Sequence, residues 1–293
     1  MFKNVVVGVD HQQNWRDAVA LATELTDDDG QLTLARVSQR DRVHRRGRAT
    51  RNETYGRQQA IELLQAACAE TGVRARLRVD AANSAGAGLQ QIVTQTHADL
   101  LVVGSSRRAP LGRVLMGDDM QAALNGLPCA LAIAPARYGW FDPGKIGNIG
   151  VGYDGSPESE AALTLARALA IACNARLSAC QVVTPSAELL VGTVTEAQAL
   201  EQAREHLARL GDVVPRAAVG QPAEQLAVFG DNVDLLVVGS RGYGQLGRLV
   251  HGSTSLKLGR SAHCPLLVLP RSADCASVDV AVTTEAGSPV RST

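Results

Sequence analysis

The sequence predicts an α/β protein with two tandem domains, each built on an open, mainly parallel, five-stranded sheet of the Rossmann-like kind. The first observation is an internal repeat, because Asp99–Ser105 and Asp234–Ser240 both read Asp-Leu-Leu-Val-Val-Gly-Ser. The second is the alternation of short apolar runs with segments of helical periodicity, which is typical of βαβ units. The third is composition, since aromatic residues make up only 3% and the apolar residues are mainly Ala, Val and Leu, which favours helices packed on a parallel sheet.

The repeat extends through each half of the chain, whose 293 residues themselves favour about two domains. The offset of 135 residues that relates the two identical segments also maps Cys129 onto Cys264. A second match, between residues 5–10 and residues 149–154, has an offset of 144, so the first half holds nine additional residues between these landmarks. We infer that a whole domain was duplicated.

The predicted domain boundaries follow from this repeat. The first domain is expected over residues 1–137 and the second over residues 146–271. The linker between them contains Gly and Pro residues, among them Pro143. Residues 272–293 are rich in Ser, Thr, Ala and Val without a periodic pattern, and we expect a disordered tail there.

The elements of the second half can be assigned in chain order. Ser156 is a suitable N-cap for the first helix, and Pro157 is a suitable first residue of it. Residues 234–238 form a continuous apolar run, as expected for a strand that is buried on both faces. The first half follows the same order. The predicted strands cover residues 147–153, 176–183, 212–219, 234–238 and 264–269, and the predicted helices cover residues 158–172, 195–210, 222–230 and 252–262.

Composition and charge argue against several classes of function. Lys plus Arg and Asp plus Glu both number 29, so the net charge is zero, whereas nucleic-acid binders usually carry a basic excess. No apolar run reaches the roughly 18 residues of a membrane span, and the N-terminal residues enter a strand without a secretory signal. The six cysteines form no Cys-x-x-Cys pair, so we expect reduced thiols. These features predict a cytoplasmic protein that contacts neither membranes nor nucleic acid.

An arginine-rich stretch, Arg36–Arg51, holds seven arginines where the first half carries its additional residues. Its two interpretations are a solvated loop and a docking patch for an acidic partner, an anionic ligand or nucleic acid. The stretch contains no aromatic residue, which disfavours stacking on single-stranded nucleic acid. The six histidines show no close metal-ligand spacing, so no metal site is predicted.

One glycine-rich loop has the features of a phosphate site. Gly239-Ser240-Arg241-Gly242 follows strand 234–238, and Gly252-Ser253-Thr254 comes nine residues later. Glycines directly after a buried strand let the backbone approach a ligand, since no Cβ intervenes. The second group falls at a helix start, where free N–H groups and the helix dipole favour an anion. Asp154 directly follows strand 147–153, at the same edge of the sheet, where a carboxylate can accept hydrogen bonds from a ribose. Together, these residues indicate a nucleotide site.

These residues resemble the universal stress protein family. Its ATP-binding members share a G-x2-G-x9-G-[S/T] loop, which Gly239, Gly242, Gly252 and Ser253 match without a gap. They also share an aspartate after the first strand, matched by Asp154. The opening Gly-Gln-Pro-Ala of the third helix of the second half is familiar from the family as well.

The resemblance implies the adenine nucleotide alpha hydrolase-like fold and a role in the stress response, with ATP bound in the second half, alone or with Mg²⁺. It also implies a main-chain contact from the second strand to the adenine, near Val182. Arg241 either contacts phosphate or faces solvent. No catalytic residues are expected, and any ATP hydrolysis should be slow and incidental. The predicted binding residues are Gly152, Asp154, Val182, Gly239, Arg241, Gly242, Gly252, Ser253 and Thr254.

The first half departs from this pattern. His11 and Gln12 replace the Gly-Ser that follows the aspartate in the second half. Arg107 stands where Gly242 stands and would crowd the backbone approach, while Asp118 stands where Ser253 stands and would repel phosphate. We therefore expect the first half to pack against the second and not to bind ATP in the same way.

Other interpretations stay open at this point. The chain could be an interaction scaffold that binds no nucleotide, although the intact loop argues against this. It could be a slow ATPase or nucleotidyl transferase, although residues 239–254 contain no Asp or Glu to hold a metal. Gly242–Gly247 also fits G-x-G-x-x-G, but it follows the fourth strand and not the first, so a dinucleotide site is disfavoured. We expect the halves to pair through their fifth strands; a protein partner and a homodimer remain open.

Overall fold

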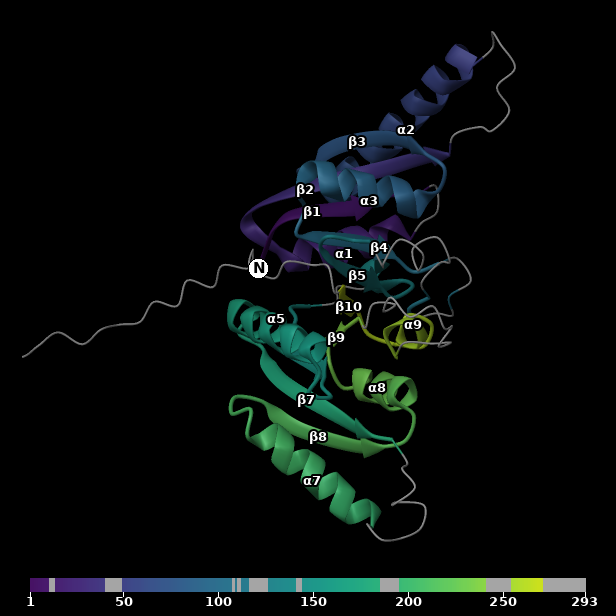
Figure 1. Cartoon of the computed structure of the whole chain (residues 1–293). Coiled ribbons are helices and arrows are strands. Elements are labelled where there is room, and N and C mark those ends of the chain that lie inside the picture. Colours follow the sequence, from purple (N-terminus) through teal and green to yellow (C-terminus); the bar gives the residue numbers. More distant parts are fainter. Residues whose placement is uncertain are drawn as a thin grey trace, which may run out of the picture.

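The computed structural model describes residues 1–10, 14–39, 49–106, 109, 112–115, 126–140, 144–184, 195–240 and 254–270, without the side chains of residues 39, 49–55 and 256. Within these residues, ten strands form one continuous sheet that runs through both halves (Figure 1). The order of the strands is β3-β2-β1-β4-β5-β10-β9-β6-β7-β8. Each half therefore contributes five strands, and neighbouring strands within a half are parallel, which confirms the predicted fold class.

The strands of the first half are β1 Phe2–Gly8, β2 Thr26–Gln39, β3 Arg76–Ala82, β4 Leu100–Gly104 and β5 Ala130–Ala134. Those of the second half are β6 Asn148–Gly152, β7 Arg176–Val183, β8 Val214–Val219, β9 Leu235–Gly239 and β10 Leu266–Leu269. The helices are α1 Trp15–Leu25, α2 Ala49–Thr71, α3 Ala85–Thr96, the 3₁₀ helix η1 Tyr138–Trp140, α5 Pro157–Cys173, α7 Glu196–Ala208, α8 Pro222–Gly230 and α9 Thr254–Leu258.

The two halves join through their fifth strands, as predicted. β5 and β10 run antiparallel, and Leu131, Ala132 and Ile133 lie opposite Val268, Leu267 and Leu266. All five residues of β5 and all four of β10 are buried. The junction is therefore a continuous part of the sheet and not a contact between two separate surfaces.

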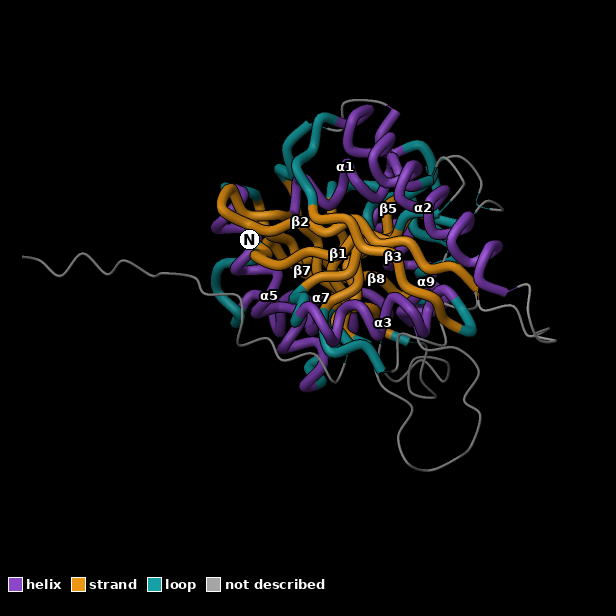
Figure 2. The backbone as a smooth tube through the Cα atoms, turned by 90° about the horizontal axis from the view of Figure 1, so that it is seen from above, coloured by secondary structure: helices purple, strands orange, loops and turns teal. Residues whose placement is uncertain are grey.

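The core lies on both faces of this sheet. Along β1, Val5 and Val7 belong to one buried cluster and Val6 to the other, as the alternation of side chains in a strand requires. The first cluster includes residues of α1, α2, α5 and α7, and the second includes residues of α3, α8 and α9. Figure 2 shows the strands as the central layer with helices on both sides. None of the helices in the described residues is long and apolar enough to cross a membrane.

The second half follows the predicted element order closely. Ser156 caps α5, because its side chain accepts a hydrogen bond from the N–H of Ser159, and Pro157 opens the helix. The predicted strand 176–183 has the observed bounds of β7. The helix predicted over residues 252–262 is shorter: α9 covers Thr254–Leu258 and is followed by turns.

Structural roles explain most of the seven-residue identity between the halves. The carboxylate of Asp99 accepts hydrogen bonds from the N–H groups of residues 3–4 at 2.8 and 3.0 Å. Asp234 does the same for residues 147–148 at 2.9 and 2.8 Å. Each aspartate thus fixes the start of the neighbouring first strand. Ser105, at the end of the segment, donates its hydroxyl to the carbonyl of Ala134 at 2.7 Å.

A buried carboxylate holds the linker between the halves. Asp17 of α1 accepts hydrogen bonds from the N–H groups of Arg137 and Gly139 at 2.8 and 2.9 Å. Tyr138 donates its hydroxyl to Glu24 at 2.9 Å. Burial raises the pKa of Asp17, although the two backbone hydrogen bonds act in the opposite direction. The start of the linker is therefore fixed to the first half.

Candidate functional site

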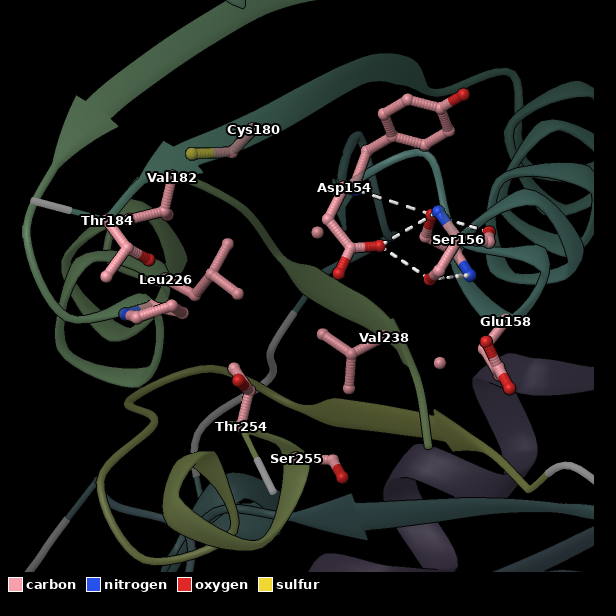
Figure 3. A pocket seen from close by; sticks show the side chains of 15 residues that line it. Asp154, Ser156, Glu158, Cys180, Val182, Thr184, Leu226, Val238, Thr254 and Ser255 are labelled. Carbon is pink, nitrogen blue, oxygen red and sulfur yellow. Dashed lines mark hydrogen bonds between the residues drawn. The ribbon is translucent and has the colours of Figure 1, made fainter. Parts of the chain in front are cut away.

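A cavity of about 230 Å³ lies at the carboxyl ends of β6, β7 and β9 in the second half (Figure 3). This sheet edge is where ligands of open parallel α/β sheets bind, because the strand order reverses beside the first strand. The lining residues are Gly152, Tyr153, Asp154, Ser156, Glu158, Ser159, Cys180, Val182, Thr184, Pro222, Leu226, Val238, Gly239, Thr254 and Ser255.

Five of the nine predicted binding residues line this cavity: Gly152, Asp154, Val182, Gly239 and Thr254. They come from four separate segments of the chain, so their convergence is a property of the fold. The other four predicted residues, Arg241, Gly242, Gly252 and Ser253, lie outside the described residues. So do the four residues on which the first half departs from the family pattern, His11, Gln12, Arg107 and Asp118.

Asp154 is held by the start of α5. Its Oδ1 accepts a hydrogen bond from the N–H of Ser156 at 3.1 Å and another from the hydroxyl of Ser156 at 2.5 Å. Its own N–H donates to the hydroxyl oxygen of Ser159 at 3.3 Å. These bonds turn the chain sharply between β6 and α5, with Gly155 at a φ of +77°. The carboxylate is thereby kept at the mouth of the cavity, where the side chain is exposed.

Tyr153, the residue before Asp154, helps to hold this turn in place. Its N–H donates to the carbonyl of Cys180 at 3.0 Å, and its hydroxyl hydrogen-bonds to Glu160. The ring lies 5.8 Å from the ring of His206 on α7. Burial and the Glu160 carboxylate raise the pKa of Tyr153 to about 12, so its hydroxyl is neutral at physiological pH.

One side of the cavity is apolar. Cys180 and Val182 of β7 lie there with Leu226 of α8 and Val238 of β9, as Figure 3 shows. Burial raises the pKa of Cys180 to about 11, so its thiol acts as a small hydrophobic group. Such a wall suits a flat, weakly polar ring.

The backbone of Val182 faces this side as well. The register of β6 on β7 ends at the pair of Gly152 and Cys180, so β7 extends beyond its neighbour. The carbonyl of Cys180 points toward β6, because it accepts the N–H of Tyr153. The N–H and C=O groups of residues two apart point to the same side of a strand, so those of Val182 face the space beyond the end of β6.

The opposite end of the cavity is polar. Thr254 and Ser255 lie at the start of α9, and Glu158 lies in the first turn of α5. In Figure 3, Thr254 and Ser255 stand below Val238, and Glu158 stands on the far side of it from Leu226. Hydroxyl groups at a helix start can donate hydrogen bonds to an anionic ligand. The Glu158 carboxylate would favour a cation beside such a ligand.

Gly239 has a packing reason in addition to the predicted approach of a ligand to its backbone. A Cβ on Gly239 would lie 2.4 Å from the carbonyl oxygen of Glu158, where no atom fits. A Cβ on Gly104 would lie 2.2 Å from the carbonyl oxygen of Asn14. In both halves, therefore, the glycine lets the start of the first helix pack closely against the end of the fourth strand. Gly239 lines the cavity, but helix packing alone requires a glycine there.

Sequence reasoning missed several lining residues. Glu158 was not predicted, because it lies in the first turn of α5 and far in sequence from the glycine-rich loop. Leu226 lies one helical turn after Pro222 in a helix that was predicted, and its apolar side chain at that spacing is the signal that could have found it. Thr184 directly follows the strand that carries Val182. Among the described residues, no three His, Cys, Asp or Glu side chains gather as a metal site.

Comparisons with known proteins agree with this architecture. Universal stress protein Rv2319c of Mycobacterium tuberculosis (strain ATCC 25618 / H37Rv) is 28% identical over 215 residues, which are 68% of this chain and 73% of that protein. The crystal structure of a universal stress protein from Archaeoglobus fulgidus DSM 4304 matches with a TM-score of 0.67 and 15% identity, over 92% of this chain and 98% of that one. A functionally unknown protein, PA1789 of Pseudomonas aeruginosa PAO1, matches with a TM-score of 0.61 and 15% identity, over 94% and 95% of the two chains.

At these identities, the two solved structures show a shared fold. The sequence model of the Universal stress protein family goes further, because it matches residues 1–135 and again residues 145–270. The chain therefore belongs to the universal stress protein family, as a tandem form with two of its domains.

Proposed function

We propose that this protein is a stress-response module that binds ATP in its second half, and that binding changes its conformation or its contacts with a partner. The observation that carries the proposal is the convergence of Asp154, Val182 and Thr254 on one cavity. One side of this cavity is apolar, its mouth carries a carboxylate, and its other end carries hydroxyls at a helix start. A nucleotide has the same order of parts in its base, ribose and phosphates.

The proposed orientation follows from the chemistry of each wall. The adenine would lie against Val182 and Leu226, within reach of the backbone groups that β7 presents beyond the end of β6. The ribose hydroxyls would donate to the carboxylate of Asp154, which the turn before α5 keeps at the mouth of the cavity. The phosphates would lie near Thr254 and the glycine-rich loop. If Mg²⁺ accompanies ATP, the Glu158 carboxylate is suited to hold it with the phosphates.

Calorimetry with the purified full-length protein tests the proposal, after mass spectrometry has excluded carried-over nucleotide. We expect one ATP site per chain. Asp154→Ala should abolish binding, since it removes the ribose acceptor. Asp10→Ala is the matched control, because Asp10 holds the corresponding place in the first half, and it should leave binding unchanged. If Asp154→Ala binds ATP as tightly as the parent, the assigned site is wrong.

A slow ATPase is the second candidate, and the presence of Glu158 in the cavity is the observation that favours it. A turnover assay with Mg²⁺ or Mn²⁺ separates the two functions. Release of phosphate above the background of the Glu158→Gln variant would indicate an enzyme. Binding without release would leave ATP as a regulatory ligand. Two ATP sites per chain would mean that Arg107 and Asp118 do not prevent binding in the first half.

A further inference from the structure

A short segment of the first half, Gly112–Leu115, is tied firmly to its own domain. The N–H of Leu115 donates to the hydroxyl of Ser105 at 3.2 Å, and the carbonyl of Leu115 accepts from Ser106 at 2.7 Å. The N–H of Gly112 donates to the carbonyl of Ala136 at 3.1 Å. The segment lies between the two groups that correspond, in the second half, to the ends of the phosphate loop.

From this anchored position the segment reaches into the second half. The N–H of Val114 donates to the carbonyl of Ala262 at 2.7 Å. Its side chain is fully buried, in the same cluster as Leu258 and Ala262. Ala262 follows the turns at the end of α9, and its own N–H donates to the carbonyl of Leu258. The first half thus supplies a hydrogen bond to the turn that follows α9, and a buried side chain to the cluster that includes Leu258.

The amino end of the same helix forms part of the cavity. Thr254 and Ser255 line it, and the carbonyl of Ser255 accepts the N–H of Gly259 at 2.9 Å. A helix of five residues is too short to be stable alone, so its position depends on what holds it in place. α8 packs against α9, and Val114 hydrogen-bonds to Ala262, whose own N–H donates to Leu258 at the end of the helix.

We infer that Val114 is a positioning residue for the nucleotide site of the other half. By fixing the carboxyl end of α9, Val114 keeps Thr254 and Ser255 where they can meet the phosphates. The segment Gly112–Leu115 of the first half therefore helps to complete the site of the second half. The inference rests on the proposed function for its ligand, but the positioning of α9 can be measured without any ligand.

The test uses the full-length chain and two variants with the same chemical change. Val114→Ala shortens the buried side chain that shares a cluster with Leu258 and Ala262. Val19→Ala is the control, because Val19 is equally buried in the first half but lies on α1, in the cluster on the other face. Hydrogen exchange gives the protection of the Gly259 and Ala262 amides, and calorimetry gives the affinity for ATP.

We expect the two amides to exchange faster in Val114→Ala than in the parent, and the dissociation constant for ATP to rise about fivefold or more. Val19→Ala should lower the unfolding temperature but leave both readouts near the parent values. Unchanged exchange in Val114→Ala would overturn the inference. So would unchanged affinity in a parent that binds ATP.

Two further outcomes distinguish a failure of the proposed function from a failure of the inference about α9. If the parent binds no ATP, the proposed function fails, while faster exchange in Val114→Ala alone would still support the positioning of α9. If Val114→Ala does not fold, Val114→Thr has nearly the same shape with one methyl replaced by a hydroxyl, and the same two measurements apply to it. Parent-like exchange and affinity in that variant, with a lowered unfolding temperature, would count against the inference.

Discussion

Replacing Gly104 with alanine should destabilise the protein, although Gly104 belongs to the half that lacks an intact phosphate loop. The new Cβ would lie 2.2 Å from the carbonyl oxygen of Asn14 and 2.9 Å from its carbonyl carbon. Both atoms are backbone, so no side chain can rotate away. The start of α1 must therefore move from the end of β4 by roughly 1 Å, an overpacking that typically lowers the free energy of unfolding by about 1–3 kcal/mol.

Urea unfolding followed by circular dichroism measures this effect, and Gly239→Ala should show a decrease of the same order, since its Cβ would lie 2.4 Å from the carbonyl oxygen of Glu158. Gly56→Ala is the control. Apart from its own helix backbone, no described atom lies within 4 Å of a Cβ at Gly56, which is inside α2, so alanine should stabilise the helix by about 0.5–1 kcal/mol. Replacing glycine with alanine is thus expected to lower the free energy of unfolding at Gly104 and Gly239 and to raise it at Gly56.

A Gly104→Ala variant that unfolds at the same urea concentration as the parent would refute this reasoning. It would mean that helix and strand do not approach as closely as described, and that the glycine has another purpose. If only Gly239→Ala were destabilised, the close approach of helix and strand would hold in the second half alone.

Two further predictions concern buried titratable groups. Burial raises the pKa of Asp17 above its ordinary value near 3.8, so its contribution to stability is greatest below that value and is lost as the pH rises through the folded pKa. The difference in free energy of unfolding between the parent and Asp17→Asn should therefore grow as the pH falls from about 7 to about 4. The midpoints of urea unfolding measure this difference, and a difference that stays constant with pH would contradict the raised pKa. For Cys180, whose pKa is about 11, only on the order of one thiol in a thousand is ionised at roughly pH 8, so iodoacetamide should alkylate it about a hundredfold more slowly than an exposed thiol. Site-resolved mass spectrometry checks this, and rapid labelling of the folded protein would be the contrary result.

The sequence predicted the sheet well because the relevant signals are local. Apolar runs, the Ser156 cap and Pro157 each act over a few residues, so β7 and the start of α5 lie where they were expected. The pairing of β5 with β10 could be predicted as well, because the repeat implies two similar sheets, each with a fully apolar fifth strand.

Long-range packing could not be read from the same signals. Nothing in the spacing of Glu158 shows that the first turn of α5 lies beside Gly239, because this depends on how closely helix and strand approach. Val114 is similar, since an isolated apolar residue in a loop does not reveal that it shares a buried cluster with Leu258 of the other half. The apolar wall of the cavity also depends on which face of each element turns inward.

The duplication separates residues that serve the fold from residues that serve the ligand. Gly8 and Gly152 end the first strands of the two halves, and a Cβ on either would meet a leucine and a valine at 3.1–3.3 Å. The aspartates before the fourth strands have the same partners in both halves. Two of the segments in which the halves differ, around residues 11–12 and 107–118, correspond to the turn and the loop of the candidate site.

If this separation is right, the first half lacks only the ligand-specific residues, and restoring them should create a second site. The five changes His11→Gly, Gln12→Ser, Arg107→Gly, Asp118→Ser and Asp119→Thr give the first half the turn and loop residues of the second. Leu89 and Val103 of the first half already stand beside Gly8 as Leu226 and Val238 stand beside Gly152, so an apolar wall is present for the base. Calorimetry should then give two ATP sites per chain, and one site when Asp154→Ala is added. A stoichiometry that stays at one would show that the ability to bind ATP depends on more than these five residues.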